Sequence, residues 1–394
     1  MGYVETVSTL PPNFTLLQVT PELETGGAEQ TTVDVARAVV RAGGQALVAS
    51  RGGRMSPALA EAGGVLIEMP AHSKNPLRLL DNAIRLIGLI RGEGVSLIHA
   101  RSRAPAFSAL WAAKATGIPF VATYHGVYNA KGRLKRWYNA VMTRGEVVIA
   151  NSEYTRRHVI EEHGIDPERV VAIPRGVDLA RFDPERVGTE RLEALRSAWG
   201  LDPADTRLKV LLAGRLTRWK GQKLLIDAAA RLKASGEDRF LILLAGDDQG
   251  RAAYRAELEQ AIGGGNLRDN VRIIGHCEDM PAAYLLADVA AAPSLDPEAF
   301  GRTAVEPQVM GRPVIAAAHG GATETVVDGK TGWLVAPGDP DAWAEALRTA
   351  IKTTAKKRAA MGAAARERAC RLYSVEAMCA ATLAVYTRVL EARR

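Results

Sequence analysis

The sequence predicts an α/β protein built from two parallel-sheet domains. Short apolar runs alternate with amphipathic helical stretches along the whole chain, which is the order of parallel-sheet architecture. The length of 394 residues exceeds what a single hydrophobic core usually serves, so two domains are expected. A second strand–helix series begins near Leu208, after a polar stretch at 183–207. We therefore expect one domain over residues 1–185 and a second over residues 186–374.

Hydrophobic periodicity gives the elements in chain order. A helix over 28–42 places Val33, Ala36 and Val39 on one face, and the chain ends in another amphipathic helix over 375–394. Neither domain carries the Gly-x-Gly-x-x-Gly fingerprint after its first strand, which argues against a nicotinamide enzyme. The expected strands are 14–19, 46–50, 96–100, 119–125, 146–152 and 170–176 in the first domain, and 209–215, 240–246, 271–276, 289–294 and 313–318 in the second.

Composition and charge limit the possible functions. No run of about 18 apolar residues is present to span a membrane, and the first residues lack the basic and apolar regions of a signal peptide. Three cysteines without metal-ligand spacing fit reduced thiols in the cytoplasm. The net charge of +7 favours anionic partners, such as nucleotides or an acidic membrane face. Nucleic acid is disfavoured because no nucleic-acid-binding motif is found.

Two motifs of the first domain follow expected strands. The stretch "GGAEQ" places Gly26 and Gly27 before a helix, where backbone N–H groups and the helix N-terminus favour an anion. The alternative is a tight strand-to-helix turn. The stretch "TYHGVY" places His125 at a strand end, where it would face a ligand cleft. The alternative there is a structural histidine.

The second domain has a basic motif after its first strand. In "AGRLTRWKGQ", Arg215 leaves the strand and Lys220 precedes the next helix. Because open α/β sheets bind ligands at the carboxyl ends of their strands, the two cations are placed to neutralise a diphosphate. The alternative is a pair of exposed basic residues.

Two glutamates stand eight positions apart in "PEAFGRTAVEPQVMG". Proline is tolerated in a first helical turn, so Pro307 predicts a helix that begins close to 303–306, with Glu306 at its start and Glu298 on the preceding loop. A carboxylate accepts hydrogen bonds from sugar hydroxyls, although a glutamate at a helix start also stabilises the helix dipole. Both interpretations can hold together.

Two other charged stretches need an interpretation. Basic residues stand beside aromatic ones at Arg133, Lys135, Arg136, Trp137 and Tyr138, which is what a peripheral membrane contact needs, although a solvated basic helix explains them nearly as well. Asp339-Pro340-Asp341 has the form of a metal-binding pair, but an N-cap followed by proline explains it. We expect no metal site.

Together these motifs resemble the retaining glycosyltransferases of family 4. They occur in the family's order, and the resemblance covers the chain from Gly26 to its final helix. It implies the GT-B fold, in which two Rossmann-like domains face a central cleft and the last helix, here 375–394, crosses back to the N-terminal domain. It also implies a UDP- or GDP-linked sugar as substrate, with no separate cofactor.

The resemblance assigns roles to residues of the second domain. Glu298 would hold hydroxyls of the donor sugar, Glu306 would bind the nucleotide ribose, and Arg215 with Lys220 would neutralise the diphosphate. Backbone amides at Phe300, Gly301 and Arg302 would contact sugar or phosphate. Gly275 and His276 would lie where the family seats the nucleotide base.

The same resemblance assigns Gly26 and Gly27 to the loop over the diphosphate and acceptor, and His125 to the vicinity of the transferred sugar. Three departures stand out. Arg175 replaces the usual asparagine, the helix reads "EPQVMG" instead of an alanine-rich form, and Arg302 is larger and more basic than usual. The Arg302 side chain would bind either an anionic sugar or a phosphate group.

The implied reaction is hexose transfer with retention, by a front-face route that needs no metal. The acceptor would be a lipid-linked glycan, such as lipopolysaccharide core at the inner membrane face, or else a soluble glycan. A non-hydrolysing nucleotide-sugar epimerase is the main alternative, because it shares the two-domain fold. Conversion of a UDP-sugar without an acceptor would distinguish that enzyme.

Overall fold

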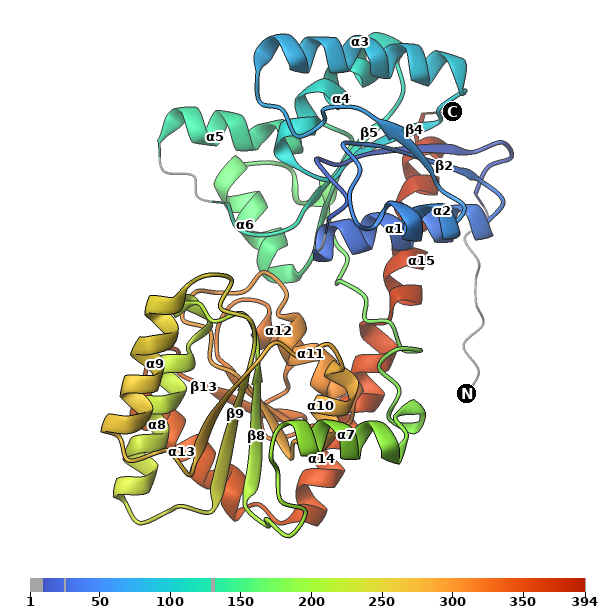
Figure 1. The fold of residues 1–394 in the computed structure, drawn as a ribbon. Coiled ribbons are helices and arrows are strands. Elements are labelled where there is room, and N and C mark those ends of the chain that lie inside the picture. The colour runs from blue at the N-terminus through green and yellow to red at the C-terminus, as the bar shows by residue number, and fades with distance from the viewer. Residues whose placement is uncertain (1–9, 25, 129–131, 394) are drawn as a thin grey trace. The chain divides into compact units, whose positions relative to one another are not determined.

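The computed structural model describes residues 10–24, 26–128 and 132–393, and it divides into two compact units (Figure 1). Unit 1 comprises Met1–Gly176 and Val375–Arg394, and unit 2 comprises Val177–Ser374. The division thus falls at residue 176, before the boundary expected at residue 185. The physical reason is that the Val177 N–H donates to the Tyr373 carbonyl at 2.7 Å, which ties the start of unit 2 to its end.

Within the described part of unit 1, seven parallel strands form one sheet in the order β3-β2-β1-β4-β5-β6-β7. The chain winds outward from β1 to β3 and returns to the other side of β1 as β4. The strands are β1 (Thr15–Val19), β2 (Gln45–Ser50), β3 (Val65–Glu68), β4 (Leu97–Ala100), β5 (Phe120–Tyr124), β6 (Val147–Ala150) and β7 (Val170–Ala172).

The helices of unit 1 begin and end at residues suited to those positions. Asn75 caps α3 by accepting from two backbone N–H groups, with Pro76 in its first turn, and Gly117 ends α4 in the left-handed conformation. The helices are α1 (Gly27–Arg41), α2 (Ser56–Glu61), α3 (Pro76–Gly92), α4 (Arg103–Thr116), α5 (Arg133–Asn139), η1 (Ala140–Thr143), α6 (Glu153–His163), η2 (Pro167–Arg169) and α15 (Val375–Glu391).

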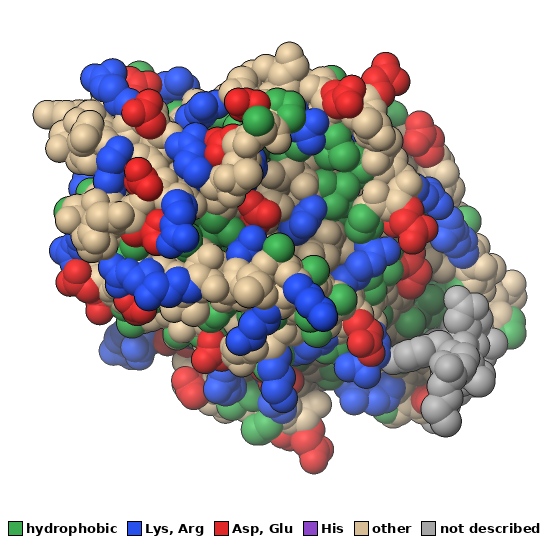
Figure 2. All heavy atoms as spheres, turned by 90° about the horizontal axis from the view of Figure 1, so that it is seen from below, with side chains coloured by type: hydrophobic (Ala, Val, Ile, Leu, Met, Phe, Trp, Pro, Cys, Tyr) green, Lys and Arg blue, Asp and Glu red, His purple; other side chains and the backbone are tan. Residues whose placement is uncertain are grey.

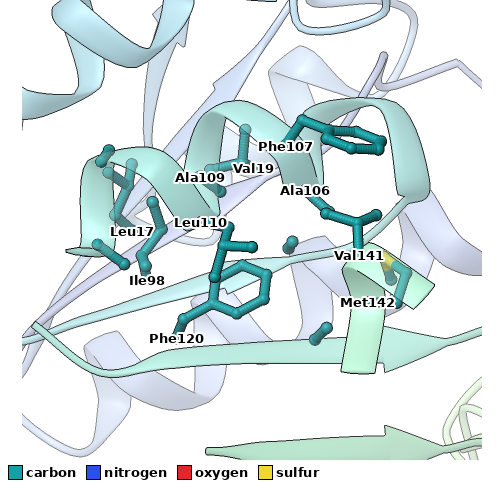
Figure 3. Close-up of a cluster of buried hydrophobic side chains, with 14 of the residues drawn as sticks. Leu17, Val19, Ile98, Ala106, Phe107, Ala109, Leu110, Phe120, Val141 and Met142 are labelled. Carbon is teal, nitrogen blue, oxygen red and sulfur yellow. The ribbon is translucent and has the colours of Figure 1, made fainter. Parts of the chain in front are cut away.

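Two apolar layers cover the faces of the unit 1 sheet. On one face, Ala106, Ala109 and Leu110 of α4 pack over side chains of the strands, as Figure 3 shows for Leu17, Ile98 and Phe120. On the other face, α1 and the C-terminal helix α15 share a layer that includes Leu16, Val48 and Tyr386. Alternate residues of each strand point to opposite faces, so every strand contributes to both layers.

Within the described part of unit 2, six parallel strands form a sheet in the order β10-β9-β8-β11-β12-β13. The strands are β8 (Leu208–Ala213), β9 (Phe240–Ala245), β10 (Val271–Gly275), β11 (Val289–Ala292), β12 (Val314–Ala317) and β13 (Gly332–Val335). The helices are η3 (Pro184–Arg186), α7 (Thr189–Ala198), η4 (Arg218–Lys220), α8 (Gln222–Ala234), α9 (Ala252–Gly264), α10 (Met280–Leu286), α11 (Arg302–Val309), α12 (Ala322–Thr325), α13 (Pro340–Lys352) and α14 (Ala355–Leu372).

The unit 2 sheet is also buried on both faces. Val210 and Leu212 contribute to one apolar layer, while their neighbours Leu211 and Ala213 contribute to the other. Asp339 caps α13 by accepting from two backbone N–H groups, with Pro340 in the first turn, as expected. Among the residues that the structure describes, no three His, Cys, Asp or Glu side chains gather where a metal ion would need them.

Each sheet has one point at which its strand order reverses. This point lies between β1 and β4 in unit 1 and between β8 and β11 in unit 2. Doubly wound sheets bind ligands outside the carboxyl ends of the strands at such a point. The loops that leave these four strands are therefore where functional side chains are expected.

The surface carries charge of both signs. On the face drawn in Figure 2, basic side chains are interspersed with acidic ones. In the described part of the chain, no helix is both long and apolar enough to cross a bilayer.

Candidate active site

Lys220 and Glu298 meet at the reversal point of unit 2. Lys220 ends η4 on the loop after β8, and Glu298 lies on the loop after β11. The Lys220 Nζ donates to Glu298 Oε1 at 2.7 Å, and the two side chains are only 12% and 16% exposed. Ser294 Oγ donates to the same oxygen at 2.5 Å. Two motifs that lie far apart in the sequence thus form one largely buried charged cluster.

Glycine at position 221 allows these two loops to touch. Gly221 has a φ of 77°, and a Cβ there would lie 1.9 Å from the Pro293 carbonyl oxygen. The Leu295 N–H also donates to the Trp219 carbonyl at 2.7 Å. Any other residue at 221 would push the loops apart, since a backbone carbonyl cannot yield to it.

Residues after β12 hold Glu298 from the other side. The Gly321 N–H donates to the Glu298 carbonyl at 2.8 Å, and a Cβ on Gly320 would lie 2.5 Å from that oxygen. His319 Nε2 lies 2.8 Å from the Ser294 carbonyl, so this nitrogen carries the proton and donates. The turn at 319–321 therefore fixes both Ser294 and Glu298.

A pocket of about 230 Å³, part of it open to solvent, lies beside this cluster. Glu298, Ser294, Thr303 and His319 provide polar side chains, and the rest of the lining is alanine and glycine. Such a lining suits a ligand with hydroxyls on one side and carbon on the other. The pocket is lined by Ala292, Ser294, Glu298, Gly301, Thr303, Ala304, Ala317, His319 and Ala322.

The expectation that Glu306 begins a helix is wrong. Helix α11 runs from Arg302 to Val309, so Pro307 lies inside it and Glu306 lies in its second turn. Gly301 can start the helix earlier than the proline implies because it takes a φ of 82° as its N-cap. Glu306 is 9% exposed, accepts from the Tyr284 hydroxyl at 3.2 Å and pairs with Arg302 at 2.8 Å. Arg302 is thus engaged by a carboxylate of its own helix.

The ring of Phe300 is buried within unit 2. It is 4% exposed and packs edge-on against Tyr373, so only its backbone is available for binding. Burial, followed by the neighbouring Glu306 carboxylate, raises the pKa of the Tyr284 hydroxyl well above its ordinary value. Tyr284 therefore stays neutral and remains a hydrogen-bond donor to Glu306.

Within the described part of unit 2, three predicted residues form no hydrogen bond or ion pair with Lys220 or Glu298. The Arg215 side chain is exposed and approaches Gln249 at 3.5 Å, while its carbonyl accepts from Gln222. Gly275 ends β10, the edge strand, and His276 follows it as an exposed residue. These two residues lie two strand positions from β8.

In unit 1, His125 follows β5 and contacts Arg175, which follows β7. Arg175 Nη2 lies 3.3 Å from His125 Nδ1. Because a guanidinium only donates, Nδ1 accepts and the proton sits on Nε2. Burial, then Arg175 and Arg101, lower the pKa of His125 well below its ordinary value, so the ring is neutral at pH 7.

Arg175 also occupies the space beside the glycine loop. A Cβ on Gly27 would lie 2.1 Å from Arg175 Nη1, so the guanidinium lies directly over this backbone. Gly26, the N-cap of α1, is extended with a φ of 173°. Thus Gly27 and His125, from two predicted motifs, both contact Arg175, a residue to which the sequence assigned no role.

Comparison with known proteins identifies the chain. The family model "Glycosyltransferase Family 4" matches residues 25–181, and "Glycosyl transferases group 1" matches residues 196–368. A solved glycosyltransferase from Rickettsia africae ESF-5 is 33% identical, with 97% of this chain and 100% of that chain covered and a TM-score of 0.88. The chain belongs to the family 4 glycosyltransferases. Its two parallel-sheet units are those of the GT-B fold, as the sequence predicted.

Two further relatives of this family 4 glycosyltransferase carry more specific names. HepE from Anabaena, solved in complex with UDP-glucose, is 26% identical, with 97% and 99% of the two chains covered and a TM-score of 0.77. The D-inositol 3-phosphate glycosyltransferase of Geodermatophilus obscurus is 34% identical over 257 residues, which is 64% of this chain and 54% of the relative. The chain spans about half the length of the curated relatives it matches.

The basic-aromatic stretch of this glycosyltransferase forms α5 in unit 1. Trp137 is 53% exposed, although its ring centroid lies 5.5 Å from that of Phe107. Tyr138 is half-buried against the same ring, and Arg136 pairs with Glu162 at 3.1 Å. Arg133 and Lys135 are exposed. The helix therefore presents two cations and one large ring to solvent, and the other two residues are partly engaged by the protein.

Sequence reasoning missed several residues that build the two sites of this glycosyltransferase. Ser294, His319 and Tyr284 surround the predicted glutamates, and Arg101 and Asn151 line the pocket beside His125. All but Tyr284 stand one to two residues beyond a strand end, which is the signal that would have found them. Tyr284 lies inside α10 and has no such signal.

Proposed function

We propose that this glycosyltransferase moves a hexose from a nucleotide-diphospho-sugar to a glycan or lipid-linked acceptor, with retention of the anomeric configuration. The Lys220–Glu298 pair carries the proposal. A cation suited to a diphosphate stands beside a carboxylate suited to sugar hydroxyls, at the reversal point of the sheet. A donor bound there meets both groups where its sugar joins its phosphate.

Binding of the donor would break the Lys220–Glu298 ion pair and give each of the two side chains a new partner. Lys220 and Glu298 pair with each other in the structure, and both are mostly buried. A buried ion that loses its partner is costly, so each must gain a new one at the same time. The diphosphate offers oxygens to Lys220 and to the exposed Arg215, and the sugar hydroxyls donate to Glu298.

Other groups would complete the donor site. Glu306, held by Tyr284 and Arg302, would accept from the ribose hydroxyls. His125 would donate through Nε2 to the transferred sugar, and the glycine loop of unit 1 would approach the diphosphate. The backbone at Phe300, Gly301 and Arg302 would supply amide donors, and Gly275 with His276 would flank the base.

The reaction we propose breaks the bond between the anomeric carbon and the diphosphate oxygen. The electron pair leaves on the diphosphate, where Lys220, Arg215 and the N-terminus of α8 stabilise the developing charge. The anomeric centre becomes oxocarbenium-like, and the acceptor oxygen attacks it on the face that the leaving group vacates. The acceptor proton passes to the departing phosphate oxygen, and the configuration is retained.

Positive side chains take the electrostatic role that a divalent ion has in other transferases. We therefore expect transfer to continue in EDTA, because Lys220 and Arg215 are part of the chain. Full loss of transfer in EDTA, restored by Mg²⁺ or Mn²⁺, would contradict this part of the proposal.

A lipid-linked glycan, such as lipopolysaccharide core, is the acceptor that the surface of unit 1 supports best. Arg133, Lys135 and Trp137 on α5 suit an anionic bilayer, which would place the protein at the cytoplasmic face of the membrane. Helix α3 of the same unit exposes Leu77 by 78%, Leu80 by 53% and Ile84 by 62%. These three residues recur at helical spacing, so α3 presents an apolar stripe to solvent beside its exposed charged residues.

A second acceptor class is favoured by the curated relatives. Several that match the chain, including that of Kineococcus radiotolerans at 35% identity over 267 residues, are named D-inositol 3-phosphate glycosyltransferase. Their name favours a soluble polyol phosphate as acceptor. A transfer assay with a polyol phosphate and with a lipid-linked glycan, side by side, separates the two acceptors.

A thermal-shift panel of UDP-, GDP- and ADP-sugars tests the donor. One nucleotide sugar should raise the melting temperature, because a ligand that binds only the folded state stabilises it by mass action. The shift should vanish in Lys220→Ala and remain in Lys223→Ala, whose side chain pairs with Asp227 on the surface of α8. Conversion of that sugar without any acceptor would favour the epimerase alternative instead.

A further inference from the structure

A buried arginine that forms no ion pair with any described residue lies at the reversal point of unit 1. Arg101 follows β4 and is 2% exposed. Its Nε and Nη2 donate to Gln18 Oε1, and its Nη1 lies 3.5 Å from the Thr123 hydroxyl, so both partners are neutral. Asp34, the carboxylate that acts on it through space, already pairs with Arg37 at 3.3 Å. A buried charge in this position is costly without a counter-charge.

Among the buried polar atoms that line this pocket, His125 Nε2 and Asn151 Oδ1 have no hydrogen-bond partner in the described part of the chain. Asn151 donates through Nδ2 to the His125 carbonyl at 3.0 Å, which fixes the orientation of its amide. One atom is therefore a donor and the other an acceptor, and a hydroxyl group, which both donates and accepts, suits either atom.

A second cation, Arg175, also lines this pocket. Arg175 stands where the family usually has asparagine, and its guanidinium contacts the His125 ring. Burial, and after it Arg175 and Arg101, lower the pKa of His125 and favour its neutral form. The pocket thus has a positive potential that its own side chains leave uncompensated at Arg101.

We propose that this pocket binds an oxyanion, a phosphate monoester or a carboxylate, carried by a hydroxylated substrate, with Arg101 and Arg175 as its cationic partners. His125 Nε2 and Asn151 Oδ1 hold an adjacent hydroxyl of the same molecule. The proposal rests on the proposed transferase function for the identity of this molecule as donor or acceptor. The pocket spans about 270 Å³, part of it open to solvent, and is lined by Thr31, Arg101, Thr123, His125, Ile149, Asn151, Ile173, Arg175, Met378 and Thr382.

A buried water molecule is the competing explanation. Water would satisfy His125 Nε2 and Asn151 Oδ1, since it both donates and accepts. It would leave the charge of Arg101 uncompensated, whereas an oxyanion compensates it. Binding of charged and neutral sugars therefore separates the two explanations.

Isothermal titration of the full chain with glucose 1-phosphate, glucuronate and glucose provides the test. We expect at least one of the two charged sugars to bind tighter than glucose by about tenfold or more, and the difference to shrink with added salt. Arg175→Asn, which restores the usual family residue, should remove most of the gain. Arg91→Gln is the matched control, because it removes one exposed charge from α3 of the same unit.

The relative affinities of the three sugars show which anionic group the pocket prefers. A gain for glucose 1-phosphate alone indicates a phosphate-bearing substrate, and a gain for glucuronate alone indicates a uronate. Equal binding of all three sugars overturns the proposal in favour of a water-filled cavity. So does a gain that survives both Arg175→Asn and Arg101→Gln, each checked by circular dichroism for a native fold.

Failure here is distinguishable from failure of the proposed function. Nucleotide-sugar binding that depends on Lys220 is measured on the same protein preparation. If that binding persists while charged sugars gain nothing from Arg175, the oxyanion inference fails and the transferase assignment stands. If the nucleotide sugar does not bind, the proposed function fails while the oxyanion pocket is still tested directly.

Discussion

The two units place charged clusters at equivalent points of their sheets but balance the charge differently. In unit 2, Lys220 pairs with Glu298 and Arg302 pairs with Glu306, so each cation has a carboxylate within 3 Å. In unit 1, Arg101 has neutral partners, and Arg175 contacts a neutral histidine. A ligand must therefore displace an existing pair in unit 2, whereas in unit 1 it would supply the counter-charge that Arg101 does not receive from the described residues.

The two units also differ in which of their side chains have shifted pKa values. Hydrogen bonds from Arg207 and Arg239 lower the pKa of Asp205 and of Glu237 in unit 2, each to about 2. Burial lowers the pKa of His99 and His125 in unit 1 well below the ordinary value. Unit 2 thus depends on ionised carboxylates and unit 1 on neutral histidines, which gives each unit its own response to substitution and to pH.

Removing the cation of unit 2 tests the comparison most strongly. We expect Lys220→Ala to lower turnover by at least ~100-fold, since it removes one electrostatic donor to the leaving group. The Lys220 side chain is mostly buried, contrary to the exposure expected of a surface lysine, so the substitution also leaves Glu298 without its ion pair. Steady-state kinetics measure the loss, and hydrogen exchange of unit 2 shows whether the fold persists.

Two controls separate chemistry from folding in this experiment. Lys223→Ala breaks an exposed pair with Asp227 and should change turnover by less than about twofold. The double variant Lys220→Met with Glu298→Gln removes both charges of the pair and should fold well but remain inactive. A folded Lys220→Ala protein with full turnover would show that the paired cluster is structural only.

Replacing the basic residues of α5 tests whether membrane binding depends on unit 1 and not on unit 2. Arg133 and Lys135 would each contribute about 1 kcal/mol near an anionic bilayer, and Arg136 contributes less because it pairs with Glu162. Changing all three to Ser should weaken binding to phosphatidylglycerol liposomes by roughly thirtyfold at low salt, since ~1.4 kcal/mol is one decade. Sedimentation with liposomes measures the change.

The matched control removes the same charge from unit 2. Lys352 is exposed on α13, and Lys356 and Lys357 are exposed on α14, so their replacement by Ser should leave liposome binding almost unchanged. Transfer to a short soluble acceptor should also persist in the α5 variant. Equal losses of liposome binding in both triple variants would mean that binding depends on the net charge of the protein. In that case α5 would be an ordinary solvent-exposed surface.

Most of the fold was predictable because buried parallel strands are continuous apolar runs. The eleven runs expected to be strands match β1, β2 and β4–β12. The two that were missed, β3 and β13, are four-residue edge strands with partly exposed residues, and their short apolar runs at 65–67 and 333–336 were not assigned to strands. The helix start near Glu306 was wrong because Gly301, and not Pro307, decides where α11 begins.

The sites were predictable only as separate motifs. The sequence placed Lys220 and Glu298 on loops after strands, but their contact depends on β8 and β11 being neighbours. Arg101, Asn151 and Arg175 converge for the same reason, from the ends of β4, β6 and β7. Strand order is a non-local property, so a single motif does not reveal which loops meet.

Lowering the pH should destabilise the two units in different windows. The folded-state pKa of His99 and His125 lies below the unfolded value of about 6.5, so the unfolded state binds more protons below that pH. Their stabilising contribution is present above pH ~6.5 and is lost as the pH falls, by at most about tenfold in the unfolding equilibrium per histidine per pH unit. For Asp205 and Glu237 the loss begins below pH ~4.5 and continues toward pH 2.

Hydrogen exchange, corrected for its intrinsic pH dependence, follows each unit separately. Unit 1 should lose protection between pH 6.5 and 5, before unit 2 does. His99→Gln should reduce this loss, and Asp205→Asn should affect only the acidic window of unit 2. Simultaneous loss of protection in both units near pH 6 would contradict the assignment of separate ionisation windows.

The smallest expected effect comes from removing the hydrogen bond that Tyr284 donates to Glu306 in unit 2. Tyr284 is 1% exposed and donates to Glu306, which keeps its ion pair with Arg302 when the hydroxyl is removed. Tyr284→Phe should raise the donor KM about fivefold and leave kcat nearly unchanged, because one hydrogen bond to a binding group is worth ~1 kcal/mol. Tyr254→Phe removes a similarly buried hydroxyl from the Gln222 side chain and should leave KM unaltered. A fall in kcat with constant KM would instead place Glu306 at the reacting bond, and unit 2 would then use both of its paired carboxylates in the transition state.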